Sequence, residues 1–273
     1  MKRKLFLFGL ILLVLPLIQS CQESSALSKP KDPGAEVDSN EHLMMAVLYT
    51  QTAAEYRALC YQAFNIARLQ LDNSLKIMGL MKQQAIVVDI DETVLDNSPY
   101  EAKCILDNIF YPAYWDEWMN KSDAKPVPGA LDFLKYAESK KIEVYYVTNR
   151  KEKYRQQTLN NLQQAGFPFA DNEHLMMKTE ESSKESRRKK IMETQAIIIL
   201  IGDNLNDFSD VFEKKTIPER FEMTDELKTE FGKRFIVLPN AMYGDWENAI
   251  YNYSYDLSPT EKSGARHEHL QGF

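Results

Sequence analysis

The chain contains a series of short, mostly apolar segments, each followed by polar residues. Three of them, residues 85–88, 142–147 and 196–201, are nearly continuous runs of apolar, aromatic or β-branched side chains. Such runs are typical of strands that are buried on both faces of a parallel sheet. Shorter runs at 174–177 and 234–238 predict two further strands.

Segments with a helical spacing of apolar residues lie between these strands. We expect helices in the ranges 41–72, 99–122, 130–140 and 154–165, with Gly166 as the natural stop of the last. A charged, helix-prone stretch follows at 210–233. Strands that alternate with helices predict an α/β fold, a three-layer sandwich around a mainly parallel sheet.

The first 20 residues have the pattern of a signal peptide. Three basic residues precede the apolar run 5–18, which is shorter than the roughly 20 residues that a membrane-spanning helix needs. The run ends in Ile18-Gln19-Ser20-Cys21, which resembles a bacterial lipobox and implies lipidation of Cys21 and export to an outer membrane. The alternative is an ordinary secretory signal followed by an incidental cysteine.

Residues 21–40 are rich in Ser, Pro, Gly and charged side chains. This composition predicts a flexible tether, which leaves residues 41–273 as the folded domain. The chain has 33 basic and 40 acidic residues, a net charge of −7, which argues against nucleic acid as a partner. Small anionic substrates remain compatible with this charge, because a bound metal ion can reverse its sign locally.

Cysteine and histidine usage adds little chemistry. Apart from Cys21, only Cys60 and Cys104 are present, and both lie among apolar residues at helical spacing. An exported protein can form a disulfide, but buried free thiols fit these surroundings better. His267 and His269 form a pair without a third ligand, so we expect a solvated tail there and no metal site.

Polar signatures follow three of the predicted strands: Asp89-Ile90-Asp91-Glu92-Thr93, Thr148-Asn149-Arg150 and Gly202-Asp203-Asn204-Leu205-Asn206-Asp207. The carboxyl ends of parallel strands meet at one edge of a sheet, where ligands bind. Like charges about 4 Å apart cost roughly 4 kcal/mol at an effective dielectric of about 20, so gathered acids predict a bound cation. Oxygen ligands without paired His or Cys favour Mg²⁺, which suits phosphoryl chemistry.

These signatures carry a resemblance to a known family. DIDET resembles the first motif of the haloacid dehalogenase (HAD) superfamily, Thr148 its second-motif hydroxyl, and GDNLND its acidic fourth motif. The longer strings DIDETVLDNSPY, VTNR, GDNLNDF and PNAMYGDWENA, behind a lipobox, are similar to class C bacterial acid phosphatases. The resemblance covers nearly all of the mature chain. It implies a HAD-like, Rossmann-like fold with small helical cap elements at about 41–80 and 98–125.

The resemblance also implies an activity, that of an outer-membrane lipoprotein acting as acid phosphatase and 5′-nucleotidase on phosphomonoesters such as nucleoside monophosphates. Asp89 would be the nucleophile that forms a phospho-aspartate. Asp91 would be the general acid that protonates the leaving oxygen and then the base that activates water. Mg²⁺ would be held by Asp89, the backbone carbonyl of Asp91 and Asp203, with Asp207 orienting metal-bound waters.

Other residues would contact the substrate. Thr148, Asn149 and Lys184 would bind the phosphoryl oxygens. Lys184 is preferred to Lys178, Lys189 and Lys190 because Lys184 and Arg187 match the K-x-x-R spacing of the family. One departure is the run TEESS, where the family often has a KDKS-like run. Tyr243, Trp115 and Trp118 would stack on a nucleobase or aryl leaving group, although packing between cap and core is an equal alternative for the two tryptophans.

Two other functions compete with hydrolysis. A phosphotransferase would use the same intermediate but pass the phosphoryl group to an alcohol. A surface receptor would bind haem or a nucleotide without turnover, and the motif acids would then be dispensable. The sequence leaves open the preferred substrate, the pH optimum and the oligomeric state, a homodimer included.

Overall fold

The computed structural model describes residues 40–76 and 83–273. The predicted signal peptide (1–20), most of the predicted tether (21–40) and Cys21 therefore lie outside the described residues. Among the helices that are described, none combines the length and apolarity needed to cross a membrane.

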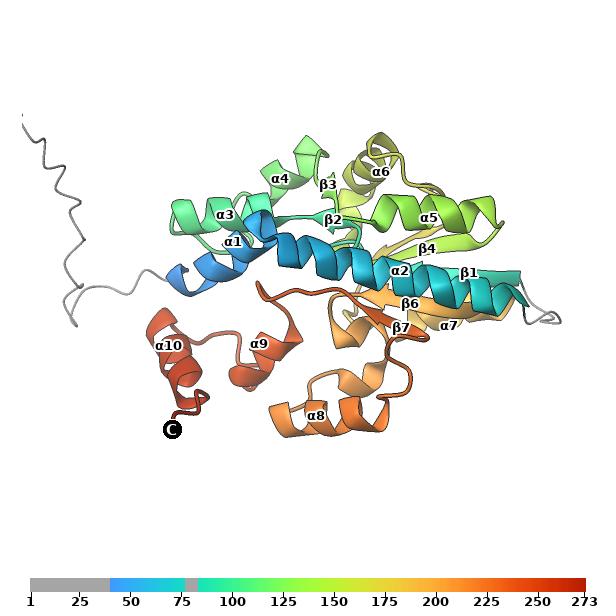
Figure 1. Cartoon of the computed structure of the whole chain (residues 1–273). Coiled ribbons are helices and arrows are strands. Elements are labelled where there is room, and N and C mark those ends of the chain that lie inside the picture. The colour runs from blue at the N-terminus through green and yellow to red at the C-terminus, as the bar shows by residue number, and fades with distance from the viewer. Residues whose placement is uncertain (1–39, 77–82) are drawn as a thin grey trace, which may run out of the picture. The chain divides into compact units, whose positions relative to one another are not determined.

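A five-stranded sheet forms the centre of the domain, in the order β5-β4-β1-β6-β7 (Figure 1). Its strands are β1 (Gln83–Val88), β4 (Glu143–Lys151), β5 (Leu175–Lys178), β6 (Gln195–Gly202) and β7 (Phe235–Val237). Every neighbouring pair in this sheet is parallel. The predicted mainly parallel α/β sheet is therefore confirmed, and β1 lies at its centre between β4 and β6.

Helices cover both faces of the sheet, because alternate side chains of each strand point to opposite sides. Ile86 and Val88 pack with buried residues of α2 (Ala54–Lys76), α5 (Ala130–Ser139) and α6 (Arg155–Gln164). Figure 1 shows α2 running along the sheet beside α5. Ala85 and Val87 face the other side, where Ile191 of α7 (Glu185–Thr194) packs. These layers form the predicted three-layer sandwich.

Smaller elements lie around the carboxyl edge of the sheet. β2 (Leu95–Asp96) and β3 (Lys125–Pro126) form an antiparallel pair, and α3 (Ser98–Leu106) and α4 (Trp115–Lys121) lie between them in the chain. The N-terminal elements are η1 (Glu41–Leu43) and α1 (Met44–Thr52). Three further 3-10 helices are η2 (Glu152–Tyr154), η3 (Leu205–Asp207) and η4 (Asp210–Phe212). The remaining small elements are two α-helices, α8 (Ile217–Glu226) and α9 (Asp245–Ile250).

In the C-terminal region His267 and His269 are exposed, as expected of a solvated tail, but most of this segment is helical. Residues Pro259–Glu268 form α10, which a capping box of Ser258 and Glu261 initiates. His267 lies in its last turn and His269 is its C-terminal cap residue. Cys60 and Cys104 are both buried and unpaired, as predicted.

Candidate active site

The loop that follows β1 brings Asp89 and Asp91 to the carboxyl edge of the sheet. The backbone N–H of Asp89 still donates to the carbonyl of Ile201 in β6, at 2.9 Å. The chain then turns sharply at Glu92, which has a positive φ of 57°. The buried Glu92 carboxylate accepts a hydrogen bond from the backbone N–H of Asn97 at 2.7 Å. This bond ties the two ends of the loop together and fixes the acids at the strand end.

The loop that follows β6 supplies two further acids. Thr93 Oγ1 donates to Asp203 Oδ1 at 3.1 Å, and Asn240 Nδ2 donates to Asp203 Oδ2 at 2.8 Å. Asp207 Oδ2 accepts the backbone N–H of Asn204 at 3.0 Å, which caps the first turn of η3. Both carboxylates are thus oriented by neighbouring groups.

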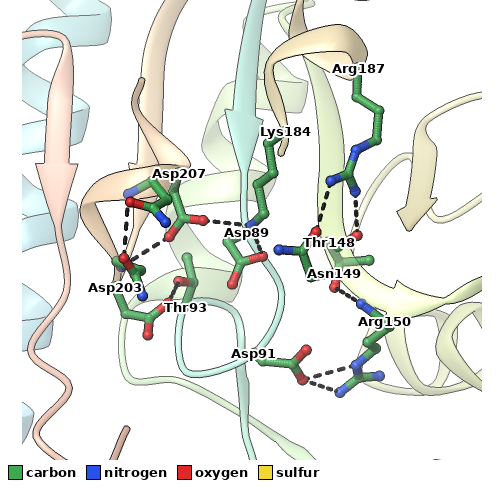
Figure 2. Close-up of polar contacts among 12 residues, drawn as sticks. Asp89, Asp91, Thr93, Thr148, Asn149, Arg150, Lys184, Arg187, Asp203 and Asp207 are labelled. Carbon is green, nitrogen blue, oxygen red and sulfur yellow. Dashed lines mark hydrogen bonds and ion pairs between the residues drawn. The ribbon is translucent and has the colours of Figure 1, made fainter. Parts of the chain in front are cut away.

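Two of these acids, Asp89 and Asp207, bind one buried lysine (Figure 2). One oxygen from each of Asp89, Asp203 and Asp207 lies within 4.8 Å of the other two. Lys184, just before α7 and 5% exposed, donates to Asp89 and, at 2.6 Å, to Asp207. The predicted choice of Lys184 thus places an ammonium group directly beside Asp89. Three carboxylates with only oxygen donors fit a hard divalent cation such as Mg²⁺.

The electrostatics of this cluster favour a cation. Burial raises the pKa of Asp89 well above its ordinary value, and the charges of Asp207, Asp203 and Asp91 add to this, while Lys184 opposes it. Burial, followed by the charge of Asp207, raises the pKa of Asp203 to about 7. One lysine does not balance these carboxylates, so the cluster carries an excess of negative charge that a metal ion would neutralise.

The end of β4 forms the other wall of the site. Thr148 is fully buried, and its hydroxyl accepts the backbone N–H of Arg150 at 3.1 Å. Asn149 is exposed, and its Oδ1 accepts a hydrogen bond from Arg187 Nη2 at 2.8 Å. Arg187 also donates to the carbonyl of Thr148 at 2.6 Å, so α7 holds this strand end in place.

A cavity of about 1390 Å³ opens over the acids. Its lining includes Asp89, Asp91 and Lys184, and the predicted substrate contacts Tyr243 and Trp115. Trp115 packs edge-on against Tyr111, another lining residue, with ring centroids 5.7 Å apart. An aromatic wall and a carboxylate cluster therefore share one cavity.

Trp118 has a different place. It is absent from the described lining of this cavity and packs against the main core cluster. Its indole N–H donates to Asn97 Oδ1 at 2.8 Å. The structure therefore favours a supporting position for Trp118 behind the cavity wall over stacking on a substrate.

Comparison with known proteins identifies the family. The model of HAD superfamily subfamily IIIB (acid phosphatase) matches residues 20–246. The chain belongs to this acid phosphatase family. Its predicted family, its HAD-like fold and its class as a phosphomonoester hydrolase are thereby confirmed.

Solved structures agree with this family. The class C acid phosphatase from Bacillus anthracis is 43% identical, with a TM-score of 0.84, over 87% of this chain and 100% of that chain. A second structure of that enzyme, with tungstate bound, is 42% identical with the same coverage and a TM-score of 0.84. A more distant relative, acid phosphatase 1 of Solanum lycopersicum, is 26% identical over 165 residues. That match spans 58% of this chain and 57% of the relative's length.

Several residues lie in the site without having been assigned a role from the sequence, among them Arg150, Asn97 and Asn240. Arg150 and Asn97 bind the Asp91 carboxylate, and Asn240 binds Asp203. Arg150 follows Thr148 and Asn149 in the VTNR string. A basic residue at the end of a strand that leads to the gathered acids could have been predicted to bind one of them. Asn97 and Asn240 offer no such pattern, because amides are common in turns.

Proposed function

We propose that this acid phosphatase family member is a Mg²⁺-dependent phosphomonoesterase with 5′-nucleotidase activity that acts through a phospho-aspartate on Asp89. One observation carries the proposal: Asp89 lines an open cavity while its carboxylate lies within 4.8 Å of Asp203 and Asp207 and binds Lys184. A tungstate ion, which has the tetrahedral shape of phosphate, is bound in the related Bacillus anthracis structure.

The reaction takes place in two displacements. An oxygen of Asp89 attacks phosphorus, the bond to the leaving oxygen breaks, and Asp91 gives its proton to that oxygen. Water then attacks the phosphorus, Asp91 takes a proton from it, and the bond to Asp89 breaks to release phosphate. Thr148, Asn149 and Lys184 bind the phosphoryl oxygens, and Lys184 stabilises their growing negative charge.

The donor set for a metal is Asp89, the backbone carbonyl of Asp91, Asp203 and Asp207. The carboxylates of Asp89 and Asp203 are close enough to share one small cation, and Asp207 lies beside both. Mg²⁺ held there would supply Lewis-acid polarisation of the phosphoryl oxygens. Lys184 and the carboxylates then keep the charge of the site nearly balanced.

The aromatic wall would bind the leaving group. Tyr243 and Trp115 line the same cavity as Asp89, and a nucleobase stacked on an aromatic ring contributes about 1–3 kcal/mol. This energy would favour nucleoside monophosphates over small alkyl phosphates.

The first test is Asp89→Asn. The variant removes the attacking oxygen, so hydrolysis of both p-nitrophenyl phosphate and AMP should fall by at least about 10³-fold. The matched control Asp116→Asn changes a carboxylate that is 69% exposed, and it should keep the activity of the unchanged protein. In acid-quenched Asp91→Asn, mass spectrometry should find a phosphoryl group on Asp89. Full turnover by Asp89→Asn would exclude the phospho-aspartate.

We also propose that the mature protein is an outer-membrane lipoprotein, with residues 1–20 removed and Cys21 carrying the lipid. The supporting observation is the lipobox-like Ile18-Gln19-Ser20-Cys21. Fractionation of cells that finds the unchanged chain in the soluble fraction would contradict this anchor.

A further inference from the structure

The Asp91 carboxylate is held on one side only. Arg150 Nε and Nη2 lie 2.9 Å and 2.8 Å from Asp91 Oδ1, and Asn97 Nδ2 lies 2.7 Å from the same oxygen. Figure 2 shows the Asp91 carboxylate turned towards Arg150, away from Lys184. Among the described residues, no side chain donates to Asp91 Oδ2. The two oxygens of this carboxylate therefore have different environments.

This arrangement is rigid because its members are buried and bound elsewhere. The Arg150 side chain is 2% exposed, and its Nη1 donates to Thr158 Oγ1 of α6 at 3.3 Å. Asn97 is fully buried and also donates to Glu92 Oε2 at 3.3 Å. Trp118 of α4 donates to Asn97 Oδ1, which fixes the amide so that its N–H₂ group faces Asp91. The network therefore joins the β1 loop to α4 and α6.

We propose that Arg150 and Asn97 are positioning residues that fix Asp91 so that only Oδ2 exchanges a proton with the leaving oxygen and with water. Three donors occupy Oδ1, so that oxygen has no place for a proton. Oδ2 carries the proton when Asp91 acts as an acid and is bare when it acts as a base. The same three hydrogen bonds persist in both forms, so the carboxyl group does not rotate between the two displacements.

The proposal rests on the proposed function, because it assumes that Asp91 is the general acid. In the first step the bond from Asp89 to phosphorus forms, the bond to the leaving oxygen breaks, and the Oδ2 proton moves to that oxygen. In the second step water gives its proton to Oδ2 while its oxygen displaces Asp89 from phosphorus. No co-reactant other than water is required.

The test compares leaving groups. The ribose hydroxyl of AMP is a poor leaving group that needs the proton, whereas p-nitrophenolate leaves as an anion. For Arg150→Gln, kcat/KM for AMP should fall by about 10²-fold, within the range for general acid catalysis, with KM nearly unchanged. The value for p-nitrophenyl phosphate should fall less than about fivefold, and Arg150→Lys should lie between Arg150→Gln and the unchanged protein. A merely structural role would lower both substrates equally and would overturn the proposal.

Two further variants keep the test decisive if Arg150→Gln folds poorly. Trp118→Phe keeps an aromatic side chain but removes the indole N–H that donates to Asn97. Its kcat/KM for AMP should fall about two- to fivefold more than its kcat/KM for p-nitrophenyl phosphate. Arg155→Gln removes an arginine that binds Glu152 and the Leu175 carbonyl outside the site, and it should not change the ratio of the two substrates. If Trp118→Phe and Arg155→Gln had the same ratio of kcat/KM for AMP to kcat/KM for p-nitrophenyl phosphate, the positioning role of this network would be contradicted.

Asp91→Asn separates this inference from the proposed function. It should show the strongest discrimination between the substrates, and adding Arg150→Gln to it should cause no further selective loss. Discrimination in Asp91→Asn without any in Arg150→Gln would overturn the positioning role and keep Asp91 as the acid. Absence of discrimination in both variants would remove the acid role of Asp91 and the positioning role together.

Discussion

Gly202 illustrates at the scale of single residues how a missing side chain positions an acid. A Cβ at this position would lie 2.3 Å from Asp207 Oδ2 and 2.4 Å from Asp207 Cβ. Distances this short are forbidden, so either η3 or the end of β6 would have to move. Glycine therefore lets Asp207 reach Lys184 and the other carboxylates.

Gly202→Ala should separate Asp207 from Asp89 and Asp203. We expect kcat for AMP to fall at least about tenfold and the Mg²⁺ concentration for half-maximal activity to rise. Forced overpacking should also lower the free energy of unfolding by roughly 1–3 kcal/mol. Kinetics across a Mg²⁺ titration and urea denaturation measure these effects. The control Gly264→Ala adds a methyl group in α10 with no atom within 4 Å, so unchanged activity is expected there. Similar kinetics for both variants would contradict the argument.

The sequence predicted residues that gather at the candidate site but missed those that hold them in place. Asp89, Lys184 and Asp203 stand at strand or helix ends in patterns that predict a phosphoryl site, and the structure brings them together. The hydrogen bonds of Arg150 and Asn97 to Asp91 Oδ1 depend on rotamers and on the exact path of two loops. Residue spacing contains no information about either.

At the scale of elements, the strands were predicted best, because a buried parallel strand is apolar on both faces. The helix α10 was missed, although Ser258-Pro259-Thr260-Glu261 is a capping-box sequence with proline at the start of the helix. This segment has too few apolar residues for a helical spacing to be recognised in the sequence. The electrostatic repulsion between Glu101 of α3 and Glu247 of α9 was equally invisible, because these two acidic side chains lie far apart in the sequence.

That repulsion predicts a stability change with pH. Burial and the neighbouring Glu247 of α9 raise the pKa of Glu101 of α3 from 4.5 to about 7. Burial alone would raise the pKa of Glu247 too, but His42 and Tyr251 bind its carboxylate and lower it. Glu247 is therefore the charged partner, and in the folded state Glu101 keeps its proton up to about pH 7.

A raised pKa in the folded state means that the stability contribution is complete below pH 4.5 and is lost as pH rises through about 7. Glu101→Gln removes this loss. We expect unchanged stability at pH 4 and a gain of roughly 1–3 kcal/mol at pH 8, or about 2–4 °C in Tm for each kcal/mol. Thermal denaturation at both pH values measures this. Glu222→Gln alters an exposed carboxylate of α8 and should show no such difference. An equal gain at pH 4 and pH 8 would exclude the ionisation as its cause.

At the scale of the whole molecule, sheet order explains why distant segments form one site. β1 lies between β4 and β6, so their carboxyl ends place Asp89, Thr148 and Asp203 at one edge. The apolar runs predicted this convergence, because parallel strands share their direction. The large cavity above the edge was not predictable, since residues of η1, α3, α9 and α10 line it through contacts that no local pattern encodes.

The same convergence predicts that Mg²⁺ stabilises the folded domain. Burying Asp89, Asp203 and Asp207 together costs electrostatic free energy that Lys184 alone does not offset, and the unfolded chain does not keep these acids together. A ligand at about 100 times its Kd stabilises a protein by about 2.7 kcal/mol, which for a domain of this size corresponds to roughly 5–10 °C in Tm. Differential scanning fluorimetry with Mg²⁺, with EDTA, and with Mg²⁺ restored should show this shift and its reversal. Asp203→Asn should lose most of the Mg²⁺ response, whereas Asp116→Asn, at an exposed position, should keep it in full. An equal response in both variants would place the stabilising metal outside the acidic edge of the sheet, because Asp203 belongs to the carboxylate cluster around Asp89 and Asp116 does not.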